Sequence, residues 1–230
     1  AWWQKTSENP SSVNQENGII YYRGAIYRGP RVPRVAITID DGWIPDNIMK
    51  ACKIAERYGI KLTFFVVGKL YELKDWERPL REVLEIGGEL QNHTWSHPYL
   101  TKLPEEEIAD EIARAQEVIL KFSGGVGNSG RYLRPPYGDF NPTVVEIAHS
   151  LGLEVVFWSR SSEGTTYGPD GKLIPPEAVL SNLQNTGYGE IVLMHTNWND
   201  IGALERYLQM LASAGLAPEL LSKLAPTRFS

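Results

Sequence analysis

The chain has 230 residues, a formal net charge of −5 and a single cysteine, Cys52. The negative charge argues against nucleic-acid binding, which normally needs a basic surface, and one cysteine excludes a disulfide within the chain. No run of about 18 apolar residues occurs, so the sequence predicts no membrane span. A chain of this length is compatible with one α/β domain that is stable without cross-links.

Residues 1–33 differ from the rest of the chain, and we expect them to form an N-terminal arm and a β-hairpin. The polar, Asn- and Ser-rich stretch 1–17 is typical of a loosely held arm. We expect its two tryptophans, Trp2 and Trp3, to hold the arm against the domain or a sugar surface. The start lacks the charged and apolar regions of a signal peptide, as in a mature or trimmed form. Apolar runs on both sides of a turn in 18–33 predict the hairpin.

Residues 34–230 show alternating strand and helix patterns and are predicted to form the main domain. Apolar runs predict strands over 35–39, 62–67, 132–134, 153–158 and 191–195, with another short strand just before His93. Apolar positions at helical spacing predict helices over 46–58, 79–86, 104–122, 142–150, 176–185 and 200–214. This alternation predicts a mostly parallel sheet covered by helices, and leaves open whether the sheet closes into a barrel.

Residues that can carry chemistry follow the predicted strands. They are Asp40 and Asp41 after the first strand, His93 after the third, and Arg134, Trp158 and His195 after the later ones. Because the carboxyl ends of parallel strands lie at one edge of the sheet, we expect these side chains to converge. Such convergence is typical of an active site.

Two histidines four residues apart predict a metal site. In a helical turn His93 and His97 would lie on one face, and two imidazoles with one carboxylate can hold a divalent cation. The segment Asp40-Asp41-Gly42 is by itself a turn signal. It also offers two adjacent carboxylates, one that could bind the metal and one that could act as a base.

Three further features each have a structural and a functional interpretation. His195, at the end of an apolar run, is either a satisfied core histidine or an acid–base catalyst. Arg134 is either a surface cation or a group that orients a carboxylate. Four tryptophans next to the motifs are either core residues or stacking walls for sugar rings: Trp43, Trp95, Trp158 and Trp198.

The set of motifs resembles the polysaccharide deacetylase superfamily, carbohydrate esterase family 4, also called the NodB-homology domain. The resemblance extends over about residues 34–224. It rests on four motifs in family order: Thr38-Ile39-Asp40-Asp41-Gly42, Asn92-His93-Thr94-Trp95-Ser96-His97, Arg134-Pro135-Pro136-Tyr137-Gly138 and Leu193-Met194-His195. It implies a distorted (β/α) barrel of about seven parallel strands.

The resemblance also implies roles for the residues of the metal site. Asp41, His93 and His97 would bind one divalent metal ion, zinc in the first place, with cobalt or another transition metal as the alternative. Asp40 would be the general base, and Arg134 would hold it in place.

For the substrate, the resemblance implies that the backbone amide of Tyr137 helps to bind the oxyanion. Leu193 would line the acetyl pocket, and Trp158, from its place beside the motifs, is a further candidate for binding the substrate. His195 would protonate the leaving amine.

One motif departs from the family pattern. After the fifth barrel strand the family carries an Asp that tunes the catalytic histidine and a Trp that walls the pocket, but segment 158–164 reads WSRSSEG. Ser161 stands where the tuning Asp is expected. Glu163 and Asp200 are the candidate replacements.

We therefore expect a metal-dependent hydrolase that removes N-acetyl groups from an N-acetylglucosamine polymer, either peptidoglycan or a chitin-like glycan. An O-deacetylase acting on acetyl-xylan is the nearest alternative. A non-catalytic glycan-binding protein on the same fold is the alternative from another class. We expect a monomer that acts on an acetylated polysaccharide or oligosaccharide outside the cell or in the cell envelope.

Overall fold

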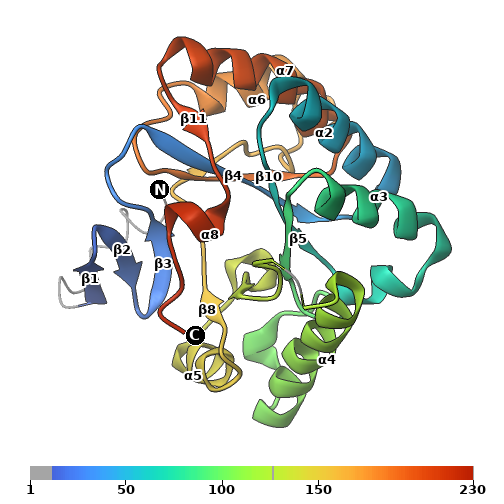
Figure 1. Ribbon diagram of the computed structural model, residues 1–230, viewed down its shortest axis with the longest axis vertical. Coiled ribbons are helices and arrows are strands. Elements are labelled where there is room, and N and C mark those ends of the chain that lie inside the picture. The colour runs from blue at the N-terminus through green and yellow to red at the C-terminus, as the bar shows by residue number, and fades with distance from the viewer. Residues whose placement is uncertain (1–11, 126, 230) are drawn as a thin grey trace.

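The computed structural model describes residues 12–125 and 127–229. Its main sheet has seven parallel strands in the order β8-β7-β6-β5-β4-β10-β9, which curl into an open half-barrel with helices around the outside (Figure 1). This arrangement confirms the predicted distorted barrel of parallel strands. Among the described residues, no helix is both long and apolar enough to span a membrane.

The strands of the main sheet are short except for the central one. They are β4 (Arg34–Asp41), β5 (Thr63–Val66), β6 (Glu89–Asn92), β7 (Tyr132–Leu133), β8 (Glu154–Val155), β9 (Arg160–Ser161) and β10 (Ile191–His195), and β11 (Ala217–Pro218) also pairs with β4. The helices are α2 (Pro45–Tyr58), α3 (Lys74–Glu85), α4 (Glu105–Ser123), α5 (Pro142–Ser150), α6 (Pro176–Leu183), α7 (Trp198–Ser213) and α8 (Leu221–Leu224). Short 3-10 helices include η2 (Gly68–Glu72), η3 (Leu100–Lys102) and η4 (Pro136–Gly138).

The central strand β4 is buried on both faces, as its continuous apolar run predicts. Val35, Ile37 and Ile39 pack in one hydrophobic cluster with residues of α2 and α7. Ala36 packs in a different cluster, inside the curled sheet. Because successive side chains of a strand point to opposite faces, Asp40 continues the inward-facing row.

The predicted helices are present, with shifts at their ends. The apolar stripe of α4 is buried, as its 3.6-residue period predicts: Ile108, Ile112, Ala115 and Ile119. Gly59 ends α2 in the left-handed conformation, with a φ of 64°. Helix α3 begins at Lys74 rather than at Pro79, which lies inside it. Helix α7 begins at Trp198, two residues earlier than predicted.

A small antiparallel sheet precedes the main one. The predicted hairpin is present as β2 (Ile19–Tyr22) and β3 (Ala25–Arg28). The expectation of a loose arm over 1–17 is wrong for its last part, because Val13–Glu16 form strand β1 and pair with β2. Trp2 and Trp3 lie outside the described residues.

Strand β3 lies between the end strand β8 and the chain that leads into β10. The amide of Phe157, just after β8, donates a hydrogen bond of 2.7 Å to the carbonyl of Ile26. On the other side, the amide of Gly29 donates one of 2.8 Å to the carbonyl of Gly189, just before β10. The N-terminal sheet therefore covers strand edges that would otherwise be unpaired. A domain boundary at Pro33 stays a prediction.

The C-terminal segment contacts both the main sheet and the N-terminal sheet through the side chain of Arg228, which forms an ion pair with a buried carboxylate. The carboxylate of Glu154 on β8 is fully buried and accepts hydrogen bonds from the amide and Nε of Arg228, each 2.9 Å long. The same guanidinium lies over the ring of Tyr21 on β2, 4.1 Å from its centroid. Arg228 thus joins the last residues of the chain to both sheets.

Arg228→Ala is expected to lower the free energy of unfolding by about 2–4 kcal/mol, because it leaves the Glu154 carboxylate buried without its cation. Urea denaturation measures this difference. The double variant Arg228→Ala with Glu154→Gln should recover part of the loss, since no unpaired charge remains. A loss below about 0.5 kcal/mol for Arg228→Ala, the size of an ordinary surface substitution, would contradict the proposed role.

Candidate active site

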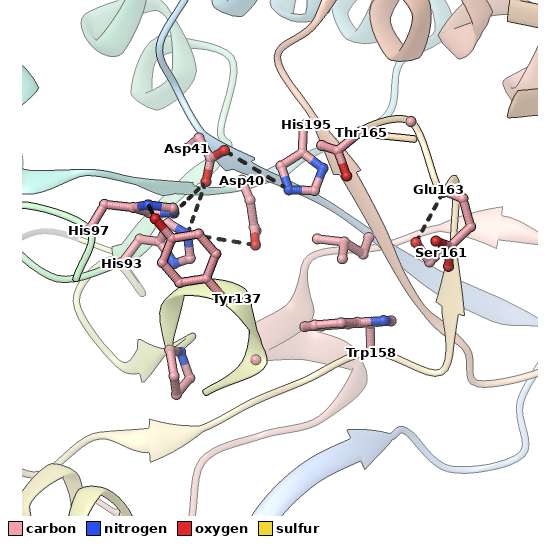
Figure 2. A pocket seen from close by; sticks show the side chains of 14 residues that line it. Asp40, Asp41, His93, His97, Tyr137, Trp158, Ser161, Glu163, Thr165 and His195 are labelled. Carbon is pink, nitrogen blue, oxygen red and sulfur yellow. Dashed lines mark hydrogen bonds and ion pairs between the residues drawn. The ribbon is translucent and has the colours of Figure 1, made fainter. Parts of the chain in front are cut away.

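The predicted site residues meet in one cavity of about 550 Å³ at the carboxyl ends of the strands (Figure 2). Eight of the nine predicted residues line it: Asp40, Asp41, His93, His97, Tyr137, Trp158, Leu193 and His195. The ninth, Arg134, lies fully buried behind them.

The adjacent carboxylates diverge because the chain turns sharply at the end of β4. Asp41 has a left-handed φ of 73°, and Gly42 follows with a φ of 85°. Left-handed backbone is tolerated by aspartate and favoured by glycine. Asp40 is 3% exposed and points into the curled sheet, while Asp41 lies nearer the rim, toward the two histidines (Figure 2).

Three side chains form a cluster that fits a metal ion. The Nε2 atoms of His93 and His97 each lie 3.1 Å from Oδ1 of Asp41, and one ligand atom from each residue lies within 4.8 Å of the others. Nδ1 of His93 lies 2.6 Å from the carbonyl oxygen of Arg134, so it is the protonated nitrogen and leaves Nε2 free as a ligand. Nδ1 of His97 is similarly occupied, 3.1 Å from the hydroxyl of Tyr137.

The charges around this cluster favour a cation. Burial alone would raise the pKa of Asp41, but its hydrogen bonds with His93 and His97 hold the pKa well below its ordinary value. Burial would lower the pKa of His93, but the nearby charges of Asp40 and Asp41 raise it overall. Two carboxylates therefore stabilise positive charge at this point, and either a proton or a metal ion can supply it.

The predicted helical turn for the two histidines is wrong. Residues 93–98 form an irregular loop after β6. Thr94 and His97 both have a left-handed φ of 67°, and this backbone brings the two imidazoles together. Within the loop, the hydroxyl of Thr94 accepts a hydrogen bond of 3.1 Å from the amide of His97. The two histidines are therefore brought together by a loop and not by a helical turn.

Arg134 connects several parts of the site, and its interpretation as a surface cation is wrong. Its Nη1 donates to Oδ1 of Asp40 at 2.7 Å and to the hydroxyl of Thr38 at 2.6 Å. Its Nη2 donates to the carbonyl oxygen of Phe157 at 2.7 Å. Burial lowers the pKa of Arg134, and Asp40 opposes that shift, but a guanidinium stays charged in proteins.

Tyr137 sits on the rim of the cavity in an unusual backbone conformation. Its φ of 62° and ψ of 5° are left-handed, and its side chain is 57% exposed. Its ring meets His97 edge-on, with the ring centroids 4.7 Å apart. A bulky residue seldom adopts this backbone conformation, so neighbouring contacts must hold Tyr137 in it.

His195 faces the Asp41, His93 and His97 cluster. Its Nε2 lies 4.0 Å from Oδ2 of Asp41. Its backbone amide donates a hydrogen bond of 2.7 Å to Oδ2 of Asp200, and its Nδ1 lies 4.0 Å from the same oxygen. Asp200 is fully buried, which raises the pKa of its carboxyl.

The structure distinguishes between Glu163 and Asp200, the two candidate replacements for the missing aspartate. Ser161 lies across the cavity from His195, and its hydroxyl accepts a hydrogen bond from the amide of Glu163 (Figure 2). The Glu163 side chain is exposed, and no ion pair joins it to His195 among the described residues. Asp200 is therefore the carboxylate next to His195. A Cβ on Gly164 would lie 2.2 Å from Oδ1 of Asp200, so glycine leaves the space that this carboxylate occupies.

Sequence reasoning missed Glu111, which supports the histidine loop from α4. Its carboxylate accepts hydrogen bonds from the amides of Trp95 (3.0 Å) and Ser96 (2.8 Å). Glu111 is one of several acids on the solvent side of a helix, and nothing in the local pattern distinguishes it from the others.

Comparison with known proteins identifies the family. The sequence model named Polysaccharide deacetylase matches residues 28–156. The chain is 30% identical to a peptidoglycan-N-acetylglucosamine deacetylase, PgdA, from Listeria monocytogenes, over 92% of this chain and 43% of that protein. It is 31% identical to a peptidoglycan-N-acetylmuramic acid deacetylase, PdaA, from Bacillus subtilis, over 69% of this chain and 60% of that protein. The chain thus spans about half the length of these curated relatives.

Solved structures share the fold. A family 4 carbohydrate esterase from Streptomyces lividans, in complex with acetate, superposes with a TM-score of 0.72 at 26% identity, covering 84% of this chain and 95% of that one. BA3943 from Bacillus anthracis, described as a CE4 family pseudoenzyme, superposes with a TM-score of 0.77 at 25% identity, covering 87% and 68%. The chain belongs to the polysaccharide deacetylase family, carbohydrate esterase family 4.

Proposed function

We propose that the protein is a metal-dependent deacetylase that removes N-acetyl groups from an N-acetylglucosamine-containing glycan, peptidoglycan or a chitin-like polymer. The observation that carries this proposal is the meeting of the Asp41, His93 and His97 cluster with Asp40 and His195 in one cavity. The activities named for PgdA and PdaA support peptidoglycan, and with it a location outside the cell or in the envelope.

The cluster would hold one divalent ion. Two imidazole nitrogens and one carboxylate oxygen suit zinc, and they also suit cobalt or another transition metal. Such an ion supplies a Lewis acid that polarises the acyl oxygen and makes water more acidic.

The surrounding residues would handle the protons and the developing charge. Asp40, held by Arg134, would take the proton of the attacking water. The backbone amide of Tyr137 would donate a hydrogen bond to the oxyanion. His195 would then give a proton to the leaving amine. Leu193 and Trp158 would line the pocket that holds the acetyl group.

Exposed aromatic side chains support a glycan as the substrate. Among the described residues, several exposed aromatics lie in the segments that follow the carboxyl ends of the strands, either in loops or at the start of a helix: Trp43, Tyr99, Tyr137, Tyr167 and Trp198. Tyr99 and Tyr137 stack face to face, with ring centroids 3.9 Å apart. Exposed rings around a polar cavity provide apolar surfaces on which sugar rings can stack.

One observation favours a second candidate, a glycan-binding protein without catalysis. The BA3943 neighbour is described as a pseudoenzyme, so this fold alone does not ensure activity. Acetate release from peptidoglycan, chitin oligomers and acetyl-xylan, with and without a chelator, tests both candidates and the acetyl-xylan alternative. Chelator-sensitive release from the first two supports the proposal, while binding without release from any substrate supports the second candidate.

The metal assignment predicts that His93→Ala and His97→Ala each lose the bound ion, because two of three protein ligands do not hold it tightly. Metal content after gel filtration measures this directly, and acetate release should fall with it. His149→Ala is the matched control, since His149 lies on α5 outside the cavity. Stoichiometric metal in the His93→Ala, His97→Ala double variant would refute the assignment.

The general-base assignment predicts that Asp40→Asn keeps its metal but loses activity by about 10²-fold or more, the size expected for removing a base. Metal content and the steady-state rate of acetate release check the two halves separately. If the variant loses its metal instead, the roles of Asp40 and Asp41 have been exchanged.

We also propose Asp200 as the residue that orients His195, in place of the aspartate expected near position 161. Nδ1 of His195 and Oδ1 of Asp200 are both buried without a hydrogen-bond partner among the described residues. Buried polar atoms normally have partners, and Nδ1 of His195 lies 4.0 Å from Oδ2 of the same carboxylate. A hydrogen bond from Nδ1 to Asp200 would hold the ring with Nε2 toward the substrate.

Asp200→Asn is expected to lower the rate on N-acetyl glycan by about 10-fold or more, and to change the rate on an activated aryl acetate little, because a good leaving group needs no proton. Comparing kcat on the two substrates tests this split. Ser161→Ala is the control and should leave both rates unchanged. Equal losses of Asp200→Asn on both substrates would show that Asp200 supports only the fold.

A further inference from the structure

The loop that carries two candidate metal ligands depends on contacts outside the cavity. In the loop from His93 to His97, two residues have a left-handed backbone conformation: Thr94 and His97. Residues other than glycine rarely adopt this conformation, so the loop needs bonds that hold it there. Its shape decides where His97 lies relative to His93.

One side of the loop is held by backbone hydrogen bonds from the segment after β5. The amide of Gly68 donates to the carbonyl oxygen of Thr94 at 2.8 Å, and that of Lys69 donates to the carbonyl oxygen of Trp95 at 3.0 Å. A Cβ on Gly68 would lie 3.0 Å from the Trp95 ring, so the glycine permits this close approach. These bonds use the carbonyl groups of the loop and leave its amides to other partners.

The two amides in the middle of the loop are held by one carboxylate on α4. Oε2 of Glu111 accepts from the amides of Trp95 and Ser96, and Oε1 accepts from the hydroxyl of Ser96 at 2.6 Å. Hydrogen bonds to a charged acceptor are stronger than those between neutral groups. Trp95 also packs against α4, where the guanidinium of Arg114 lies 3.8 Å from its ring centroid.

Helix α4 gives this carboxylate a rigid base. The helix has 19 residues, and its buried stripe includes Ile108 and Ile112, the latter next to Glu111 in the sequence. Glu111 itself does not line the cavity. It therefore acts on the site only through the loop.

We propose that Glu111 is a positioning residue that sets the geometry and the affinity of the metal site by fixing the loop between His93 and His97. The proposal rests on the metal-dependent function proposed above. Outer groups that orient metal ligands change affinity or activity by about 10–100-fold when removed, and Glu111 reaches both amides in the middle of the loop.

Zinc affinity, measured by competition with a chromophoric chelator, tests the proposal. Glu111→Ala is expected to weaken zinc binding by about 10–100-fold and to alter the visible absorption spectrum of the cobalt-loaded protein. Glu111→Gln, which keeps one acceptor oxygen in the same place, should lie between Glu111→Ala and the unchanged protein. Glu107→Ala is the matched control, because Glu107 is exposed one turn earlier on the same helix; it should change neither quantity.

The outcomes separate the two proposals. If the unchanged protein binds no zinc, the metal-dependent function fails. If it binds zinc and Glu111→Ala binds equally well with the same cobalt spectrum, the role of Glu111 is refuted. A lower urea midpoint of the metal-free Glu111→Ala variant with unchanged affinity and spectrum would show that Glu111 stabilises the fold alone, and would also overturn the proposal.

Discussion

The hydrogen bonds and the ion pair of the buried Arg134 guanidinium are the interactions on which the site depends. Its side chain joins the end of β4 to the chain just after β8, through Asp40 and the carbonyl oxygen of Phe157. Its own carbonyl oxygen holds Nδ1 of His93. One residue thus fixes the candidate base by its side chain and a candidate metal ligand by its backbone. A buried cation without partners destabilises the fold, so the position of Arg134 depends on all of these groups remaining in place.

Much of this arrangement could be predicted because it depends on local pattern. The continuous apolar run before Asp40 predicts a strand buried on both faces, and the 3.6-residue period after Pro104 predicts α4. The rule that parallel strands end at one edge predicts that the polar residues of separate motifs meet. Asp40, His93 and His195 line one cavity for this reason, whereas Tyr137 is named through the family motif.

The rest could not be predicted because it depends on contacts between distant segments. Two histidines four residues apart in the sequence can lie in a helix or in a loop such as the one that joins His93 to His97. Only contacts with distant segments decide that the loop forms here. Glu111 carries no local signal, since it is one of several acids on the solvent side of a helix. Asp200 is one of two candidates in the sequence, and only the fold shows that it, rather than Glu163, lies beside His195. The pairing of β1 with β2 was missed for a similar reason, because polar strands at a sheet edge are held by backbone bonds.

The position of β3 has a consequence for how such a protein can change. Strands β8 and β9 are consecutive in the chain but lie at opposite ends of the sheet, and β3 bonds on one side to the chain after β8 and on the other to the chain before β10. The segment between them takes part in this closure, because the amide of Phe157 donates to the carbonyl oxygen of Ile26 and that of Ser159 donates to the carbonyl oxygen of Ile191. The same segment places the ring of Trp158 in the wall of the cavity. Its backbone therefore holds the sheet closed while its side chains shape the cavity, so a side-chain substitution there can change the cavity without removing the bonds that close the fold.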